Sequence, residues 1–456
     1  MNFEVFRAYD IRGIYPSEIN EDAYYRIAKA YTYLFKPTQM VVGMDARLSS
    51  PSLKDSLVAG FLDVGVDVVD IGEITTDMIY FAVGAYGFSG GIVVSASHNP
   101  KDYNGMKLVR EKVTAISSDT GLFEIRDVLK EGKDAEVSSQ TKGKRETKDV
   151  LDDYIAHVLS FVDRDAIRKF SVVGNANFGY VSRPARRLAT ELGLDLIPLN
   201  FEPDGSFPKG TPDPMLAQNR SEVEALIKSS GADFGVAWDA DADRVMFFDE
   251  KGQFISGAYI TALLASLLLE KYGYDNKIIF DPRVIWPTQE VVKRLRGQPV
   301  ISKGGHAFIK DRMRKENALF AGEMSAHYYF RDNFYADNGI IPFLLVLEHL
   351  SRGERPLSEV MRPFVQGHYM SGELNYHVPN VQQAINAVRE KFANTGSEDF
   401  TDGYSLESDV WRFNIRGSNT EPLLRLNIEA REQKRVDDLK SEIEAIIKVP
   451  QPAATA

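Results

Sequence analysis

The chain has 456 residues, of which 44% are hydrophobic and 26% charged, and its formal net charge at pH 7 is −11. A chain of this length exceeds one ordinary core and predicts about three or four domains, while the acidic balance argues against nucleic acid and anionic membranes as partners. Because there is no cysteine, disulfides and thiolate metal sites are excluded.

The first residues show no basic stretch followed by an apolar run, as a secretory signal would require. The longest apolar stretch, residues 262–269, is far short of the roughly 20 residues that span a bilayer. We therefore expect a cytoplasmic protein without a membrane partner.

Three stretches repeat one pattern, in which a short β-branched strand run is followed by a polar loop, a helical stretch and a second strand run. The pattern is typical of parallel strands joined by crossover helices. It predicts three α/β domains in tandem. The paired strand runs cover residues 40–43 and 65–70, then 171–174 and 193–197, and finally 277–280 and 299–301.

The last hundred residues follow a different pattern. Strand runs at 409–415 and 423–428 flank a turn at 416–422, and a charged helix is expected over 434–448. This order of elements indicates a smaller α+β domain.

Two polar stretches suggest domain boundaries. Residues 131–148 are rich in Lys, Glu, Ser and Gly and are interpreted as a linker or hairpin, and a second boundary is expected near 351–363. The expected domains cover residues 1–146, 147–250, 251–362 and 363–456.

Ser97 lies in the first segment that could carry chemistry, where a strand-like run ends in the sequence Ser-His-Asn-Pro. α/β proteins place their sites beyond strand ends, and the neighbouring His98 could orient the hydroxyl. A polar turn without chemistry is the alternative. The segment is not a nucleophile elbow, because no glycine lies two residues to either side of Ser97.

Asp239, Asp241 and Asp243 crowd three carboxylates into five residues between two strand-like runs. A hard cation relieves their mutual repulsion, and magnesium is the first choice because phosphate oxygens can complete its shell. The alternatives are a solvated acidic turn and a calcium loop, but a calcium loop needs glycine where Arg244 stands.

Glu323, Ser325 and His327 alternate along a short loop after an apolar run. If the loop is extended, the three side chains face the same way. A carboxylate with a hydroxyl suits adjacent hydroxyls of a sugar. A polar strand edge is the alternative.

Arg416 begins a turn with the sequence Arg-Gly-Ser-Asn-Thr-Glu-Pro. Glycine lets the backbone approach an anion closely, the guanidinium offers a planar fork to phosphate oxygens, and Ser418, Asn419 and Thr420 add neutral donors. This turn is the local positive site that an acidic chain needs for a phosphorylated ligand. An ordinary hairpin turn is the alternative.

Taken together and in this order, these segments resemble the α-D-phosphohexomutase family, in its phosphomannomutase/phosphoglucomutase branch, over nearly the whole chain. Residues 6–13, 104–107 and 302–306 contribute to the match. The resemblance implies four domains around a central cleft. Three have an α/β fold with a mixed sheet, and the fourth is a small C-terminal α+β domain.

The resemblance also implies the roles of individual residues. Ser97 would carry the phosphoryl group and, with three aspartates, hold magnesium, while other side chains would bind the sugar and its second phosphate. The implied metal ligands are Ser97, Asp239, Asp241 and Asp243; the catalytic residues are Ser97, His98, Lys107, Arg12, Arg244, His306 and His327; and the substrate-binding residues are Tyr9, Glu323, Ser325, Arg416, Ser418, Asn419 and Thr420.

The chain departs from the family pattern at a few positions. Members often have glycine where Ala240 and Ala326 stand, and both changes add a methyl group without removing a functional group. Some members have lysine at the position of Arg283, so the role of Arg283 as a cleft cation is left open.

The implied reaction is that of a phosphomannomutase, which interconverts mannose 6-phosphate and mannose 1-phosphate and also accepts glucose phosphates. It would proceed through an enzyme phosphoserine and a hexose 1,6-bisphosphate, which also serves as activator. The alternatives are phosphoglucomutase, phosphoglucosamine mutase, a metal-dependent sugar phosphatase and a non-catalytic binding protein. Met324 argues against the amino-sugar branch, which usually has Gln there. The expected partners are hexose phosphates, and the oligomeric state is left open.

Overall fold

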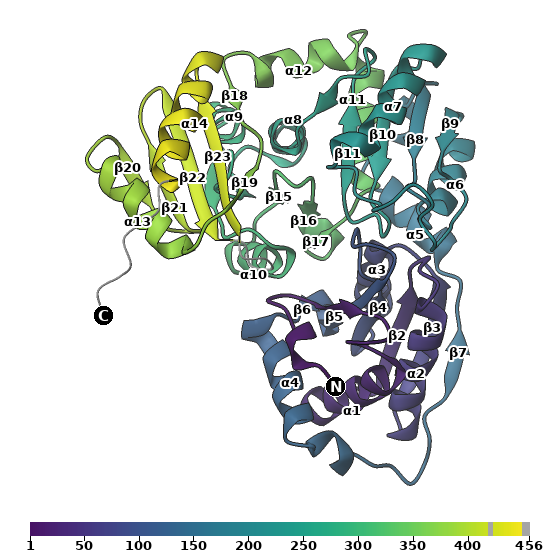
Figure 1. Cartoon of the computed structure of the whole chain (residues 1–456). Coiled ribbons are helices and arrows are strands. Elements are labelled where there is room, and N and C mark those ends of the chain that lie inside the picture. Colours follow the sequence, from purple (N-terminus) through teal and green to yellow (C-terminus); the bar gives the residue numbers. More distant parts are fainter. Residues whose placement is uncertain (418–422, 449–456) are drawn as a thin grey trace, which may run out of the picture.

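The computed structural model describes residues 1–417 and 423–448. Its strands form four sheets, numbered I to IV in chain order, which follow one another along an arc in Figure 1. Three mixed sheets with helices and a last sheet of different pattern agree with the expected fold class. Among the described residues, no helix is long and apolar enough to cross a membrane.

Sheet I has the strand order β1-β5-β4-β2-β3-β7, with β6 paired to β5. It is mixed: β2, β3, β4 and β7 run parallel, whereas β5 runs antiparallel to β4 and β1. The elements are β1 (Ile11–Ile14), α1 (Glu21–Phe35), β2 (Gln39–Met44), α2 (Ser50–Asp63), β3 (Asp67–Glu73), α3 (Thr76–Tyr86), β4 (Gly90–Val94), β5 (Tyr103–Arg110), β6 (Thr114–Ala115), α4 (Phe123–Lys130) and β7 (Arg145–Thr147).

Sheets II and III each combine parallel strands with an antiparallel edge, in the orders β12-β11-β10-β8-β9 and β14-β13-β15-β16-β17. The elements of sheet II are α5 (Leu151–Leu159), β8 (Ser171–Asn175), α6 (Ser182–Leu192), β9 (Asp195–Leu199), α7 (Ala217–Ser230), β10 (Phe234–Trp238), β11 (Val245–Phe248) and β12 (Phe254–Ile255). Those of sheet III are α8 (Gly257–Tyr272), β13 (Lys277–Phe280), α9 (Trp286–Arg294), β14 (Gln298–Ile301), α10 (His306–Glu316), β15 (Phe320–Gly322), β16 (Tyr328–Phe330), β17 (Ala336–Asp337), α11 (Ile341–Arg352) and α12 (Leu357–Val365).

Sheet IV is antiparallel throughout its described pairings, in the order β18-β23-β22-β21-β20 with β19 paired to β23. Its core is separate from that of the other sheets. The elements are β18 (Tyr369–Met370), β19 (Leu374–His377), α13 (Val381–Lys391), β20 (Ser397–Asp399), β21 (Tyr404–Glu407), β22 (Trp411–Gly417), β23 (Leu423–Ala430) and α14 (Gln433–Ile447).

The three predicted strand–helix–strand repeats are confirmed. They are β2-α2-β3, β8-α6-β9 and β13-α9-β14, and in each the two strands pair in parallel. Residues 131–148 are not a hairpin, because β7 within them adds a parallel strand to the edge of sheet I. Sheet II continues through β12, beyond residue 250. The four domain boundaries themselves stay predictions.

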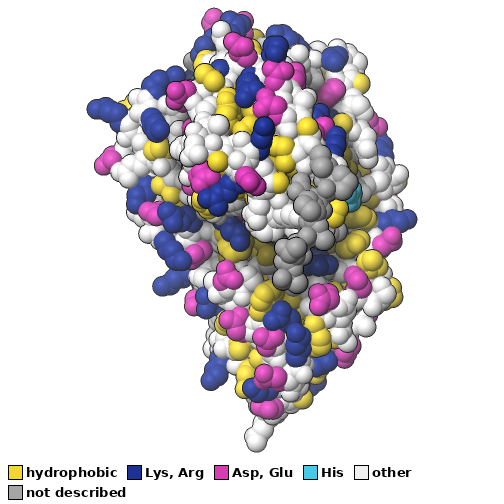
Figure 2. Space-filling model, turned by 60° about the vertical axis from the view of Figure 1, so that its left-hand side comes forward, with side chains coloured by type: hydrophobic (Ala, Val, Ile, Leu, Met, Phe, Trp, Pro, Cys, Tyr) yellow, Lys and Arg dark blue, Asp and Glu magenta, His cyan; other side chains and the backbone are white. Residues whose placement is uncertain are grey.

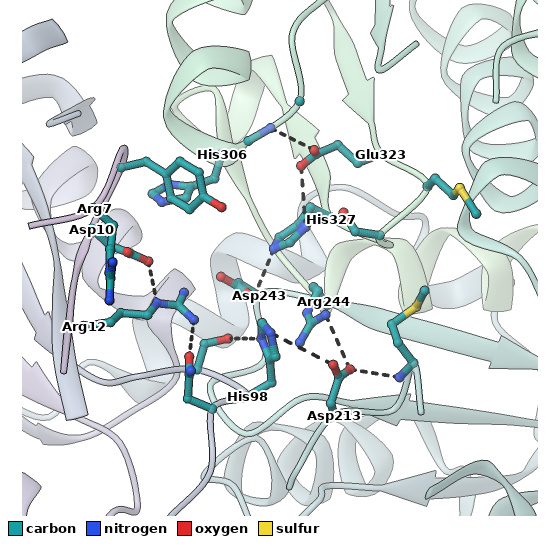
Figure 3. A pocket seen from close by; sticks show the side chains of 18 of the residues that line it. Arg7, Asp10, Arg12, His98, Asp213, Asp243, Arg244, His306, Glu323 and His327 are labelled. Atoms are coloured by element: carbon teal, nitrogen blue, oxygen red, sulfur yellow. Dashed lines mark hydrogen bonds and ion pairs between the residues drawn. The ribbon is translucent and has the colours of Figure 1, made fainter. Parts of the chain in front are cut away.

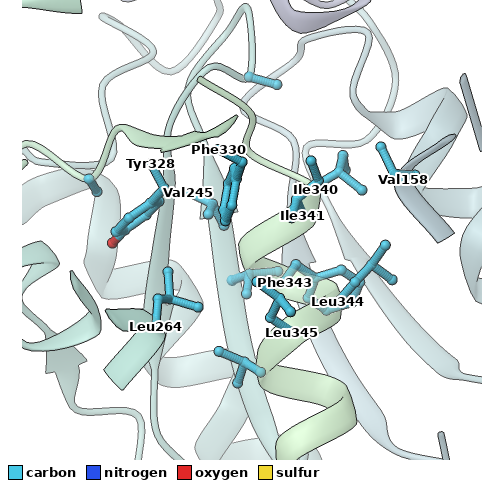
Figure 4. Packing of buried hydrophobic residues seen from close by; sticks show 14 of the residues in the cluster. Val158, Val245, Leu264, Tyr328, Phe330, Ile340, Ile341, Phe343, Leu344 and Leu345 are labelled. Carbon is cyan, nitrogen blue, oxygen red and sulfur yellow. The ribbon is translucent and has the colours of Figure 1, made fainter. Parts of the chain in front are cut away.

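Helix α11 joins sheets II and III into one core. Its side chains are buried around most of its circumference, as expected for a helix that is apolar on all sides. Phe343 meets the ring of Trp238 of β10 edge to face, with 5.8 Å between ring centroids. Figure 4 shows α11 among side chains of β11, α8 and β16. Sheets II and III therefore form a common support for the loops at their ends.

The surface in Figure 2 shows basic and acidic side chains interspersed, with no large area of one sign on that face. Charges of both signs are therefore spread over this face rather than gathered in one patch. A binding site for an anion has to be built locally, from a few cations in a cleft.

Candidate active site

A cavity of about 490 Å³ lies where loops of all four sheets meet. Ser97 reaches it from the end of β4, Arg244 from the turn before β11, Glu323 from the end of β15 and Arg416 from the last part of β22. Figure 3 shows labelled side chains from the segments around sheets I, II and III converging on the same space. A concave site with convergent polar groups is the usual place for a small ligand.

The cavity brings together most of the residues singled out in the sequence. Asp239 and Asp241 lie buried behind its wall, and Ser418, Asn419 and Thr420 lie outside the described residues. Those that line the cavity are Tyr9, Arg12, Ser97, His98, Lys107, Asp243, Arg244, His306, Glu323, Ser325, His327 and Arg416.

Ser97 follows β4 by three residues and adopts a left-handed backbone conformation with φ of 50°, which is uncommon for a residue with a side chain. The Ser97 amide donates to Ser95 Oγ at 2.9 Å. The Ser97 hydroxyl donates to Asp239 Oδ2 at 3.0 Å and lies 3.1 Å from His98 Nδ1. The serine loop of sheet I and the acidic turn of sheet II are thus in direct contact.

Arg47 holds the serine loop in place, and the sequence pattern did not reveal it. Its guanidinium is buried and donates to the carbonyl oxygens of Ser97, Asn99, Pro100 and Tyr103 at 2.6–2.9 Å. One planar group therefore fixes four backbone positions, from Ser97 itself to Tyr103 after it. The only sequence signal is an arginine in the polar loop after β2.

Asp239, Asp241 and Asp243 each offer a carboxylate oxygen within 4.8 Å of the others, and all three are fully buried or nearly so. Asp241 Oδ1 has no hydrogen-bond partner among the described residues, and Asp243 Oδ1 has no contact closer than His327 Nε2, at 3.5 Å, among them. Buried oxygens without a donor are costly unless something else satisfies them. The donor set fits a hard divalent cation such as magnesium.

The pKa values of the groups in and beside the three aspartates also show that this cluster favours a positive charge. Burial raises the pKa of Asp239 to about 7, and the charges of Asp243 and Asp241 add to the rise against the pull of Arg244. Lys107 donates to Asp241 at 2.6 Å and also to Asp243. Burial works against the charge of Lys107, but the two aspartates outweigh burial and raise its pKa. A cation is therefore already part of this cluster.

Two arginines, Arg12 and Arg244, lie close to Ser97 in the cavity wall. Arg12 pairs with Asp10 at 2.7 Å and donates to Asn99 Oδ1 at 2.5 Å. Arg244 donates to Asp239 at 2.9 Å and lies 3.5 Å from Asp213. Asp213 was not singled out in the sequence, because it is one acidic residue in a long polar loop.

Glu323, Ser325 and His327 converge as expected, but the loop is a tight turn rather than an extended strand. Ala326 has a φ of 67°, and its amide donates to the Glu323 carbonyl at 2.9 Å. A positive φ favours glycine, and this explains why members of the family that the chain resembles often have glycine at this position. Ser325 Oγ lies 3.0 Å from His327 Nδ1, and Tyr329 Oη donates to Glu323 at 2.6 Å.

The two histidines of sheet III have pKa values shifted in opposite directions. Burial lowers the pKa of His327, but Asp243, 3.5 Å from its Nε2, and Glu323 outweigh burial and raise it. Burial and the charges of Lys310 and Lys107 hold the pKa of His306 well below its usual range. His306 packs edge to face against Tyr9, with 5.1 Å between ring centroids. His327 is therefore the imidazole with the greater affinity for a proton.

The far end of the cavity is lined by Arg283, Arg416, Arg425 and Glu373. Arg283, whose role the sequence left open, pairs with Asp281 at 2.8 Å and reaches Glu323 at 3.3 Å. Its position in the cavity wall and its ion pairs place it beside the turn that carries Glu323 and Ser325. Glu373 was not singled out, because the segment before β19 has no recognisable pattern.

Comparisons with known proteins agree over the full chain. Four models of phosphoglucomutase/phosphomannomutase domains match: alpha/beta/alpha domain I at residues 4–136, domain II at 152–252, domain III at 256–367 and the C-terminal domain at 373–446.

Among curated relatives, the chain is 44% identical over 432 residues to phosphohexose mutases of Xanthomonas campestris pv. campestris strain B100, covering 94% of this chain and 96% of the relative. It is 45% identical over 432 residues to phosphomannomutase of Escherichia coli strain K12, covering 93% and 94%. A crystal structure of a phosphoglucomutase/phosphomannomutase family protein from Burkholderia thailandensis superimposes with a TM-score of 0.89 at 29% identity, over 100% of this chain and 99% of that one.

Proposed function

The chain belongs to the phosphoglucomutase/phosphomannomutase family, and from this premise we propose that it is a phosphomannomutase that works through a phosphorylated Ser97. It is a phosphohexomutase, an isomerase that interconverts mannose 6-phosphate and mannose 1-phosphate, with glucose phosphates as further substrates. The observation that carries the proposal is the contact of 3.0 Å between the Ser97 hydroxyl and Asp239. It joins the acceptor of the phosphoryl group to the acidic triplet.

Asp239, Asp241 and Asp243 would hold Mg²⁺ together with an oxygen of the Ser97 phosphate. When bound, the ion neutralises phosphoryl oxygens and stabilises the charge of the transfer. Lys107 and Arg244 are the protein's own cations beside the same phosphoryl group. Like the ion, they stabilise the negative charge of the phosphoryl oxygens during the transfer.

In the proposed cycle, a sugar 1-phosphate binds with its phosphate toward Arg416 and its free 6-hydroxyl toward phosphorylated Ser97. The hydroxyl oxygen forms a bond to phosphorus as the bond from phosphorus to Ser97 Oγ breaks. His327 takes the hydroxyl proton, because Asp243 stabilises the imidazolium that results. The departing Ser97 oxygen takes up one proton, and the proton that His327 received balances it, so that the step is neutral overall.

The product of this step is a hexose 1,6-bisphosphate, which turns so that its 6-phosphate faces Arg416 and its 1-phosphate faces Ser97. The reverse transfer then regenerates phosphorylated Ser97. Glu323 and Ser325 bind sugar hydroxyls in both orientations, and the same bisphosphate added from solution would activate enzyme that lacks the phosphate. Location in the cytoplasm and the lack of nucleic-acid and membrane partners stay predictions.

Transfer of labelled phosphate tests the proposal. Protein incubated with a hexose 1,6-bisphosphate labelled in its phosphates should acquire one label, and Ser97→Ala should abolish both this label and mutase turnover. Ser118→Ala, in an outer turn of the same domain, is the control and should be labelled normally. A labelled Ser97→Ala variant would refute the assignment. A coupled assay that compares mannose 1-phosphate with glucose 1-phosphate then measures the sugar preference.

A further inference from the structure

Glu373 places a carboxylate at the end of the cavity where the non-reacting phosphate of the sugar is expected. It immediately precedes β19 and lies between three arginines. Its Oε2 is 3.2 Å from Arg416 Nη2 and 3.9 Å from Arg283 Nη1, and its Oε1 is 3.3 Å from Arg425 Nη1. Both carboxylate oxygens are thus used to bridge guanidinium groups.

Glu373 shares its single charge among several guanidinium groups. Arg283 has Asp281 and Glu323 as further acidic partners. Arg416 is mostly buried, and burial together with the charge of Arg283 lowers its pKa against the effects of Asp402 and Glu373. The one charge of Glu373 is therefore divided between Arg416 and Arg425, while Arg283 is also paired elsewhere. A dianionic phosphate brings one more negative charge to these guanidinium groups than the carboxylate does.

The geometry of the contacts also matches that of a phosphate. A carboxylate that bridges two guanidinium groups makes the charge-assisted hydrogen bonds that two phosphate oxygens would make. The side chain of Glu373 is 23% exposed, and it starts from the edge of a strand rather than from the packed core, so it can turn away without opening the fold.

We propose that Glu373 is an internal competitor for the substrate's phosphate: it occupies Arg416 and Arg425 in the free enzyme and is displaced when a phosphorylated sugar binds. This inference rests on the proposed function, because it assigns that end of the cavity to phosphate. It makes the site selective for dianions, since an anion with one charge gains nothing over Glu373. It also eases the turn of the bisphosphate, because Glu373 replaces the departing phosphate on the arginines.

Binding of inorganic phosphate to the full-length protein, measured by titration calorimetry, tests the inference. Glu373→Gln keeps the shape of the side chain but removes its charge, and it should tighten phosphate binding by about tenfold, in line with the loss of one charge-assisted contact. Glu373→Ala should act in the same direction. If Glu373 only orients the arginines, both variants will bind phosphate more weakly, and that result or an unchanged affinity overturns the inference.

Two further variants test whether the change in phosphate affinity arises at Glu373 and Arg416. Glu290→Gln is the matched control, because Glu290 pairs with Arg431 and His368 outside the cavity and should leave phosphate affinity unchanged. In Glu373→Gln combined with Arg416→Ala, the gain should vanish. A gain that persists there would place the phosphate elsewhere and overturn the inference.

Failure of the inference is distinguishable from failure of the proposed function. If the wild-type protein shows no mutase turnover while Glu373→Gln still tightens phosphate binding, the function is wrong and the competitor role stands. If turnover is normal while Glu373→Gln weakens phosphate binding, the competitor role is wrong and the function stands.

Discussion

Arg47 determines where the hydroxyl of Ser97 lies without touching a substrate. Its four bonds to loop carbonyls support the left-handed conformation of Ser97, which the local sequence does not favour. A residue of this kind positions the nucleophile, and its loss should affect the transfer step more than the binding of the distal phosphate.

We expect Arg47→Lys to lower kcat by about 10²-fold with little change in KM, because a displacement of about 1 Å at the reacting atom costs roughly that much. Lysine keeps the charge but cannot donate to four carbonyls at once. Steady-state kinetics and the rate of Ser97 labelling measure the effect. Arg26→Lys, which alters an arginine that pairs with Asp134 in the same domain, is the control. A raised KM with normal kcat would contradict the positioning role.

At the scale of single residues, the sequence predicted those that stand in dense local patterns. Ser97 and the three aspartates are short clusters at strand ends, and such clusters are visible without a structure. Arg47, Asp213 and Glu373 are single charged residues in polar loops, and their importance comes from partners distant along the chain, up to 56 residues away for Arg47. No local pattern carries that information.

At the scale of elements, the amides at the beginning of helix α9 donate their hydrogen bonds to a residue of another sheet. The amides of Ile285 and Trp286 donate to the carboxylate of Glu429 of β23 at 2.8 and 3.1 Å. Glu429 is buried and also accepts from Arg412 at 3.2 Å. Unpaired amides at a helix start favour a negative group. This contact anchors sheet IV, which has its own core, to sheet III.

Glu429→Gln should lower the free energy of unfolding by about 3 kcal/mol, because it leaves Arg412 buried without its counter-charge. Adding Arg412→Met should recover part of the loss, since it removes the unpaired charge. Urea unfolding followed by tryptophan fluorescence reports the change, because Trp286 and Trp411 lie in this region. Equal stability of Glu429→Gln and wild type would show that the pair does not anchor sheet IV.

Element prediction succeeded where a periodic pattern was complete. The strand–helix–strand units and the final helix follow from the spacing of apolar residues, and the structure confirms them. The segment 131–148 was interpreted differently, because β7 is a three-residue edge strand whose side chains are all exposed. A strand that buries no side chain leaves no period of two in the sequence.

At the scale of the whole molecule, the cavity exists because four loops from four sheets meet. The repeats predicted separate domains, but only the family resemblance predicted that they surround one cleft, because packing between domains depends on surfaces that a local pattern does not show. One buried network shows how this packing is made. Asp77 of α3 accepts from Thr75 and from Tyr154 of α5, and Asn338, just before α11, donates to Tyr154 at 3.2 Å.

This network should make stability depend on pH. Burial raises the pKa of Asp77 to about 7, with Asp337 and Asp243 adding to the rise against the bonds from Thr75 and Tyr154. The folded protein therefore holds a proton that the unfolded chain, with a pKa near 3.8, releases earlier. The stabilisation is complete below pH 3.8, is lost progressively as the pH rises to about 7, and is absent above it.

Asp77→Asn removes this titration. The free energy of unfolding of the variant, relative to that of wild type, should rise by up to about 4 kcal/mol between pH 4 and pH 8, the amount that corresponds to a pKa rise of about 3. Urea unfolding at four pH values across this range measures the difference. Asp153→Asn, which alters an exposed aspartate on α5, is the control. A difference for Asp77→Asn that does not change with pH would mean that Asp77 titrates normally and that the three sheets are joined by packing rather than by a buried proton.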